Sequence, residues 1–425
     1  MRKWITNTDT IIFDCEFNEE LDIELISGYK IIIFSDYKLN KKLFEHYSND
    51  DFKGLEYIES KFNKDVSNLP PSLTHLTFGY EFNQNVSNLP PNITMINFGY
   101  KFNQDVSVLP PTITTIIFGH QFNKSTFNFG FYKYFGFEYG ICRNINLNFG
   151  SNFNRYVTNL PPSLTYLTFG SDFNRDVSKL PLSLTHLTFG EKFNQNVSAL
   201  PHSLTHLTFG EKFNQKVLKL PPFLTHLTFG KKFNQIVSKL PHSITHLTFN
   251  YDFDRGVSNL PPSLTHLIFD SNFNQDVLKL PYGLTHLTFG YTFNQDVSKL
   301  PQNLIHLTFG YAFNKDVSRL PCSLTHLIFG HNFNQNVSKL PPNLINLEFG
   351  HNFNQNVSNL PPSLTHLTFG EEFNQDVSNL PQTLIMLTFG KHFNKDVSKL
   401  PPFITHLTFG QYFNQDVSSL PCSLT

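Results

Sequence analysis

The sequence predicts a β-solenoid, in which coils of 20 residues each supply one short parallel strand and an extended, polyproline-like return, with few or no helices. Three observations predict this fold. The pattern L-T-H-L-T-F-G-x-x-F-N-Q-x-V-S-x-L-P-x-S, seen at residues 184–203, returns every 20 residues. From Phe153 to Phe413, the Phe position recurs at every twentieth residue without an insertion or deletion. The chain also has 47 Phe but only three Met and one Trp, so one aromatic type fills the core at fixed positions.

Each coil is expected to begin with a short strand at residues 184–189, because this segment is rich in β-branched and aromatic residues. Side chains alternate between the two faces of a strand. Leu187 and Phe189 therefore share the face toward the core, and His186 and Thr188 share the face toward solvent.

A tight turn is expected after the strand, at Gly190. Glycine tolerates a positive φ, and only Asn250 and Asp270 replace it in the repeats, two residue types that also tolerate this region. The Phe that follows the turn should point inward again, and the Asn after it should bond the exposed backbone of the neighbouring coil. Stacking would then form a structural ladder of Phe193, Phe213 and Phe233 beside one of Asn194, Asn214 and Asn234.

The return of each coil runs through Val197, Leu200 and Pro201. Proline cannot donate to a sheet ladder and biases the chain toward an extended path. No helix of three turns fits into the remaining residues, so the side opposite the strands should be extended.

The domain organisation follows from where this period breaks. Residues 1–60 are interpreted as a divergent N-terminal cap with eroded repeats, because residues 11–18 keep the F-x-x-x-F-N core of the unit; a small docking module is the alternative. Residues 61–425 form the repeat solenoid, interrupted by an aromatic-rich insertion of 11 residues within 125–143. That insertion is either a decayed coil that fills the core or a protruding binding loop. No C-terminal cap is recognisable, so self-association through the last coil is a further hypothesis.

Composition excludes several classes of function. The 32 Lys and Arg balance 33 acidic residues, so no net field attracts nucleic acid or an anionic membrane. We expect no nucleic-acid partner and no membrane partner, since no apolar run reaches the length of a membrane span and no signal peptide is recognisable. We therefore expect an intracellular protein, cytoplasmic by default.

Cys322 and Cys422 lie five repeats apart, too far for a disulfide, so the cysteines are expected to be free.

The pattern L-x-x-L-x-F with L-P before the next strand resembles the short leucine-rich repeats of bacterial effector proteins. The fuller wording F-N-Q-x-V-S-x-L-P-x-S-L-T-x-L-x-F-G resembles the FNIP repeat of amoebae and of the large DNA viruses that infect them. This resemblance covers residues 62–425, with 17 Phe-Asn dipeptides in register. It implies a leucine-rich-repeat-like fold and, if the protein is viral, a location in the host cytoplasm. Some family members carry an N-terminal F-box, which would imply a ubiquitin-ligase adaptor, but no clear F-box is seen in residues 1–60.

The most suggestive surface feature is a column of histidines at the third strand position. We call it the histidine column, and its members are His186, His206, His226, His246, His266, His286, His306 and His326. A row of one imidazole per strand lacks the converging ligands of a zinc site, so no metal site is assigned. We expect the neutral rings to stack along an exposed face and to repel one another when protonated.

No phosphate-binding loop, metalloprotease motif or nucleophile elbow is present, and no cofactor or catalytic residue is assigned. A repeated set of identical groups argues against an active site, which needs unlike groups held once. The sequence therefore predicts a non-enzymatic protein-interaction scaffold that binds an unknown partner across the sheet face. Variable residues after the Gly would take part in binding: Tyr80, His120, Ser171, Glu191, Lys231, Tyr291 and Gln411. The alternatives are a ubiquitin-ligase adaptor, or a metal- or pH-responsive binder that uses the histidine column.

Overall fold

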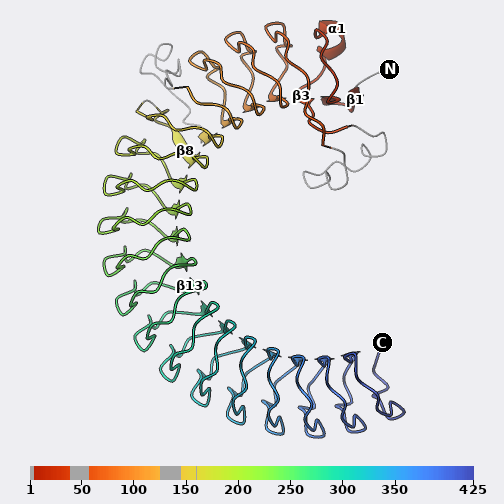
Figure 1. Ribbon diagram of the computed structural model, residues 1–425. Coiled ribbons are helices and arrows are strands. Elements are labelled where there is room, and N and C mark those ends of the chain that lie inside the picture. Colours follow the sequence, from red (N-terminus) through yellow and green to blue (C-terminus); the bar gives the residue numbers. More distant parts are fainter. Residues whose placement is uncertain (1–3, 39–56, 125–144, 159) are drawn as a thin grey trace. The chain divides into compact units, whose positions relative to one another are not determined.

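A computed structural model describes residues 4–38, 57–124, 145–158 and 160–425 of the chain (Figure 1). The chain divides into two compact units, Met1–Phe213 and Asn214–Thr425, and each is described by itself. The insertion expected within 125–143 lies outside the described residues.

In the first unit, one strand pair is antiparallel and the others are parallel: β1 pairs with β2 antiparallel, and each later strand pairs parallel with the one before it. The elements are β1 (Trp4–Thr6), β2 (Thr10–Phe13), α1 (Ile23–Ile26), β3 (Ile31–Phe34), β4 (His75–Thr77), β5 (Met95–Asn97), β6 (Thr115–Ile117), β7 (Ile145–Asn148), β8 (Leu164–Thr168), β9 (His186–Thr188) and β10 (His206–Thr208).

In the second unit all strand pairs are parallel and in register, so that each strand faces the residue 20 positions away. The elements are β11 (His226–Thr228), β12 (His246–Phe249), β13 (His266–Phe269), β14 (His286–Thr288), β15 (His306–Thr308), β16 (His326–Ile328), β17 (Asn346–Glu348), β18 (His366–Thr368), β19 (Met386–Thr388) and β20 (His406–Thr408).

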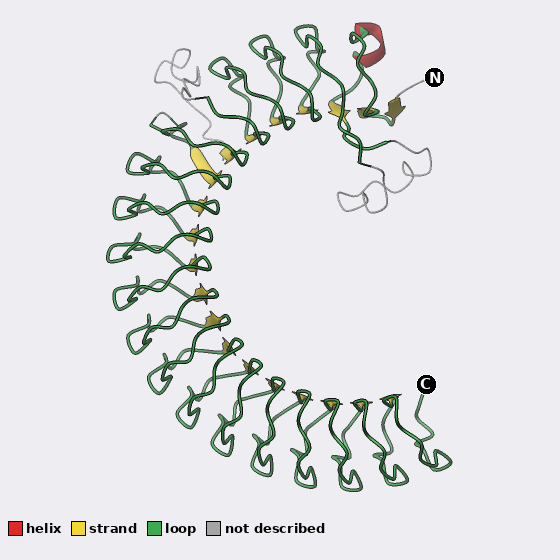
Figure 2. Ribbon diagram, viewed as in Figure 1, coloured by secondary structure: helices red, strands yellow, loops and turns green. Residues whose placement is uncertain are grey.

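The predicted β-solenoid is confirmed within each unit. Strands follow one another on one side of the coils and loops make up the other side (Figure 2). In a representative coil, Leu187 and Phe189 are buried, whereas His186 and Thr188 lie on the outer face of β9. The return is extended at residues 193–197 and contains tight turns at 191–192, 198–199 and 202–203. Within the described residues, α1 is the one α-helix, and no helix has the length and apolar composition needed to span a bilayer.

Two columns of phenylalanine rings form the middle of the core. Within one coil, the ring centroids of Phe189 and Phe193 lie 3.7 Å apart. Between coils, Phe189 lies 5.7 Å from Phe209, and Phe193 lies 6.1 Å from Phe213. All four rings are 3% exposed or less. A fully buried Phe contributes about 1.5–3 kcal/mol, so this double column is a major source of stability that no single coil could form alone.

The predicted ladders are present in both units. Phe233 stacks on Phe253 with centroids 6.1 Å apart. The side-chain Oδ1 of Asn214 accepts the backbone N–H of Asn234 at 3.0 Å, and that of Asn174 accepts the N–H of Asn194 at 2.9 Å. Each asparagine thus supplies the acceptor that the next coil's backbone needs.

The asparagine ladder has a second donor that the sequence analysis missed. Nε2 of Gln295 donates to Oδ1 of Asn274 at 3.1 Å, and the same contact recurs through the Gln position of other coils. Where Arg replaces Gln, as at Arg175 and Arg255, its Nε donates to the backbone oxygen of the preceding Asn instead. This column therefore joins neighbouring coils through side chains as well as backbone.

The physical reason given for the turn glycine is wrong. None of Gly190, Gly210, Gly290 and Gly310 has a φ in the left-handed region. A Cβ at Gly310 would instead lie 1.9 Å from the carbonyl oxygen of Gly290, far inside van der Waals contact. Glycine is needed here because the turns of adjacent coils approach too closely for a side chain.

Two coils carry a side chain at the position of the turn glycine. Asn250 and Asp270 follow β12 and β13, which run one residue further than most strands of the second unit. Nδ2 of Asn250 donates to the carbonyl of Phe229 at 2.6 Å. The turns at residues 251–252 and 271–272 keep the positions that they have in other coils, so the longer strand is the feature that distinguishes these two coils.

The N-terminal segment joins the same stack. Oδ1 of Asn18 accepts the backbone N–H of Asn63 at 3.1 Å, which extends the asparagine ladder into residues 1–60. The rings of Phe34 and Phe62 lie 3.7 Å apart, the spacing of the paired rings within a regular coil. Strand β3 and Phe62 therefore belong to one coil, although they lie far apart in the sequence and residues 39–56 between them are outside the described residues.

The coil at residues 406–425 is more exposed than the others. Phe409 and Phe413 are partly exposed, and Val417 is 50% exposed, whereas Val397 in the preceding coil is 1% exposed. Self-association through this coil stays a prediction.

Replacing Asn274 by Ala should lower the free energy of unfolding by about 1–3 kcal/mol, because two donors of the next coil lose a partly buried acceptor. Urea unfolding of the full chain measures the change. Asn274→Asp is the matched control, since Asp254 already fills the equivalent position and accepts the same two contacts at 3.0 Å. Equal losses for the Ala and Asp variants would contradict the role of Oδ1.

Gly310→Ala should lower the free energy of unfolding by roughly 2–4 kcal/mol, since its Cβ overlaps the backbone of the preceding coil. Gly256→Ala in the same unit provides the control, because nothing lies within 4 Å of its added Cβ. Thermal unfolding of both variants measures the difference. A harmless change at Gly310 would show that the close approach of the turns is not the constraint.

Candidate functional site

The outward-facing side chains of the strands form the candidate site, which we call the strand face. It consists of the histidine column, the residue directly before each His, which is threonine in most coils, and the residue two positions after each His. The Leu directly after each His position is buried in the core in strands β11 to β19, so the face repeats the same three side-chain positions from coil to coil. A ligand would therefore contact columns of like groups.

The histidine column is a set of stacked rings. In the first unit, the centroids of His186 and His206 lie 4.1 Å apart, and Tyr166 stacks on His186 at 4.1 Å. In the second unit, successive centroids lie between 4.1 and 4.4 Å apart from His226 to His326. The rings are inclined by 11–25° to one another. The structure thus brings the members of the column together within each unit.

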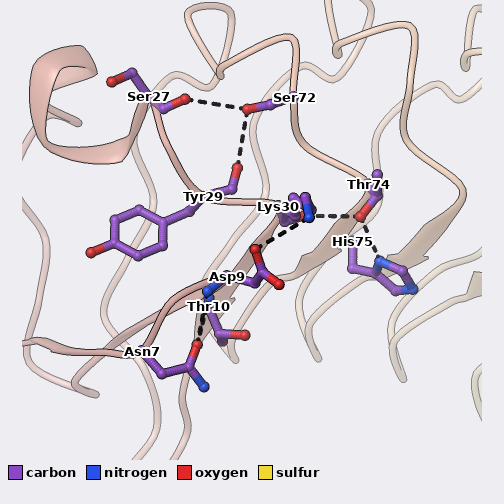
Figure 3. A network of polar contacts seen from close by, with 9 residues as sticks. All are labelled: Asn7, Asp9, Thr10, Ser27, Tyr29, Lys30, Ser72, Thr74 and His75. Carbon is purple, nitrogen blue, oxygen red and sulfur yellow. Dashed lines mark hydrogen bonds and ion pairs between the residues drawn. The ribbon is translucent and has the colours of Figure 1, made fainter.

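A threonine hydroxyl fixes the orientation of most of these rings. Oγ1 of Thr285 lies 2.9 Å from Nδ1 of His286 and 3.1 Å from the carbonyl oxygen of Thr265 in the preceding coil. The same arrangement begins near the N-terminus, where Oγ1 of Thr74 lies 2.8 Å from Nδ1 of His75 and donates to the carbonyl of Lys30 (Figure 3). The spacing of the repeat does not reveal this role of the threonine.

The column changes character in the C-terminal part of the second unit. Ile305 replaces the preceding threonine, so no such hydroxyl adjoins His306. Asn346 and Met386 then replace histidine, and Glu348 occupies the position two residues after Asn346. The strands still pair in register at both replacements, so histidine is not required for the fold at this position.

Burial lowers the pKa of five consecutive imidazoles below the ordinary histidine value. Desolvation is the largest cause, and the charge on other imidazoles of the column lowers each pKa further. The five residues are His246, His266, His286, His306 and His326. These histidines are therefore neutral near pH 7 and take up protons less readily than a free imidazole.

A second set of stacked rings borders the strand face at the position after the turn glycine. Tyr291 stacks on Tyr311 at 4.5 Å, and Tyr311 stacks on His331 at 4.3 Å. In the first unit, Tyr80 stacks on Tyr100 at 4.5 Å. The sequence analysis named this position for its variability, but not the stacking between neighbours.

The arrangement does not suit a metal ion. Tetrahedral zinc needs ligand atoms that converge on one point about 2.0–2.1 Å away. Nearly parallel rings direct their nitrogens side by side, so adjacent imidazoles cannot converge. Among the described residues, no group of three His, Cys, Asp or Glu side chains is placed to hold a metal.

The sequence profile of the FNIP Repeat family matches residues 62–88, 85–121, 173–212, 213–252, 233–269, 256–291, 273–312, 293–332, 333–372, 356–392 and 393–425. These ranges cover well over half of the chain. It belongs to the FNIP-repeat family. The resemblance inferred from the repeat wording is therefore confirmed, and the 20-residue unit is an FNIP repeat.

The chain is also similar to several solved structures. The crystal structure of CroV588, a circular leucine-rich-repeat protein of a giant virus, is 36% identical with a TM-score of 0.75, covering 100% of this chain and 79% of that one. The leucine-rich-repeat-like character of the FNIP solenoid is thereby confirmed. A TLR13–ssRNA13 complex is 13% identical with a TM-score of 0.50 and coverages of 90% and 64%, which shows a likeness of fold alone. YopM from Yersinia enterocolitica is 20% identical with a TM-score of 0.48 and coverages of 86% and 90%. No match was found among curated proteins.

Stability of this FNIP-repeat protein should fall as the pH is lowered through about 6.5, the usual pKa of histidine. The pKa values of the column histidines are lower in the folded chain than in the unfolded chain. Below about pH 6.5 the unfolded chain therefore binds more protons than the folded chain, and the free energy of unfolding decreases. Melting temperatures at about pH 7.5 and 5.5 measure the effect. A His266→Gln/His286→Gln variant should show a smaller fall, and an equal fall would assign the effect to other groups.

Proposed function

We propose that this protein is a non-enzymatic scaffold that binds a protein partner across the strand face. The observation that supports this function is the strand face itself, which repeats ordered, partly exposed His, Thr and Ile side chains in register over consecutive coils of each unit. An array of this kind offers an extended contact surface with little conformational entropy to lose on binding. The fold similarity to CroV588 supports the scaffold role without naming a partner.

The chemistry of the described residues favours binding over catalysis. The polar groups of the strand face recur with few replacements, and no coil of the described residues combines a distinct nucleophile, base and oxyanion donor. Grooves on the opposite side lie between neighbouring turns, such as the one beside Ser258, Asp276 and Lys279. Their polar side chains are mostly engaged locally, as in the neighbouring coil where Oδ1 of Asp296 accepts the backbone N–H of Ser298 at 2.8 Å.

Substitutions on the strand face should weaken partner binding by on the order of tenfold, because they place charge inside the contact. We suggest Thr288→Glu/Thr308→Glu, since Glu348 shows that the same strand position accepts a carboxylate. The measurement is the affinity for the partner recovered from the native cell. Lys299→Glu/Arg319→Glu, on the opposite turns, is the matched control.

Photo-crosslinking locates the contact independently of affinity. A photoreactive residue at position 288 should crosslink to the partner, whereas the same residue at position 299 should not. Crosslinks from position 299 alone, with undiminished binding by the Thr288→Glu/Thr308→Glu variant, would refute binding across the strand face.

A further inference from the structure

We infer that the histidine column from His246 to His326 is a proton-dependent site for an extended acidic polypeptide, whose carboxylates accept hydrogen bonds from the outward Nε2–H groups. This inference deepens the proposed function and rests on it, because it names the chemistry of a partner for the strand face. All residues that support it lie in the second unit.

The contacts of the threonine hydroxyl determine which nitrogen of the neutral imidazole carries the proton. A threonine hydroxyl has one proton, yet Oγ1 of Thr265 lies close to both the carbonyl oxygen of Thr245 at 3.1 Å and Nδ1 of His266 at 2.9 Å. Both contacts are hydrogen bonds only if the hydroxyl donates to the carbonyl and Nδ1–H donates to the hydroxyl. The neutral ring therefore carries its proton on Nδ1, and Nε2 is a bare acceptor.

Protonation of the column histidines takes place at Nε2. A proton added at Nε2 leaves the Nδ1 contact with threonine intact, so the ring becomes a cation without moving. In the described part of the chain, Nε2 of the five residues from His246 to His326 makes no hydrogen bond or ion pair. Protonation thus converts these acceptors into charged donors at the four rings that a threonine orients, and it adds a charge at His306, which Ile305 precedes.

Few acidic side chains lie near the histidine column to compensate its charge when it is protonated. At the outward strand positions of β12 to β17, Glu348 is the one acidic residue, next to Ile328 at the end of the column. On the adjoining turns, Asp252 pairs with Lys232 at 3.2 Å, and Oδ1 of Asp270 accepts a hydrogen bond from the Ser271 hydroxyl at 3.1 Å. The other titratable groups on the turns that flank β12 to β16 are His242, Tyr251, Tyr282, Tyr291, Tyr311, Cys322 and His331. A protonated column therefore leaves its positive charge largely uncompensated.

The spacing of the rings suits the carboxylates of an extended acidic polypeptide. Side chains on one face of an extended polypeptide recur about every 6.8 Å, between one and two ring spacings of the column, so successive carboxylates reach successive or alternate rings. Single-stranded nucleic acid instead needs free aromatic faces for its bases and Lys or Arg for its phosphates. Here the ring faces cover one another, and no Lys or Arg occupies an outward strand position from β12 to β17. An acidic polypeptide meets the chemistry of this surface better.

Binding of an acidic polypeptide to the column should depend on pH. The column is neutral near pH 7 because burial and neighbouring imidazoles lower its pKa values, and carboxylates of a partner stay ionised down to about pH 4.5. Binding should strengthen as the pH falls from about 7.5 to 5.5, because a bound carboxylate raises the pKa of the ring that it contacts. High salt should weaken it, since the contacts lie at the surface.

The test uses the full chain and a fluorescein-labelled peptide of alternating Asp and Glu, followed by fluorescence anisotropy. Affinity should rise on the order of tenfold between about pH 7.5 and pH 5.5. His266→Gln/His286→Gln should lose most of that rise, and the fold should survive because Asn346 and Met386 already occupy equivalent positions. His202→Gln/His242→Gln, on exposed turns outside the column, is the matched control and should behave as the wild type.

A charge-fixing variant sharpens the test. His266→Lys/His286→Lys should bind the acidic peptide at about pH 7.5 and lose the pH dependence, because an ammonium is charged at both values. Affinity that does not change with pH, an equal loss in the His202→Gln/His242→Gln control, or equal binding of a single-stranded oligonucleotide would overturn the inference. If the peptide fails while partner crosslinks from position 288 persist, the acidic-partner inference fails and the scaffold function stands.

Discussion

Contact between identical residues in adjacent coils is the interaction on which the rest of this structure depends. A phenylalanine ring meets the same ring one coil away, and an asparagine side chain bonds the backbone of the next asparagine. Each coil is too short to bury a core or to satisfy its own turn backbone. Stability therefore arises between coils, and a change at one position is felt by its neighbours on both sides.

The same constraint shapes what the strand face can do. Because every coil repeats the same outward side chains, the surface offers long columns of one chemistry and few places where unlike groups converge. Binding can use such columns, since contacts add along their length. Positions that depart from the repeat, such as Ile305, Asn346 and Glu348, distinguish one part of the face from another.

Stacking also couples the ionisation of the histidines. An isolated surface imidazole would titrate near its ordinary pKa, but rings about 4.2 Å apart lower one another's pKa in addition to the effect of burial. The threonine hydroxyl orients the ring in both protonation states. The histidine column is thus a surface whose charge can change while its shape stays the same.

The sequence by itself determined the period, the strand positions, the inward Phe and Leu columns, the asparagine ladder and the membership of the FNIP-repeat family. Periodicity suffices for these features, because identical residues at a fixed spacing must occupy equivalent places in a stack. Only the tertiary structure decided why the turn needs glycine, how Gln295 reaches Asn274, which way Thr285 turns His286, and that Phe34 and Phe62 share a coil. These features depend on distances between coils and on side-chain direction, and spacing along the chain carries information about neither.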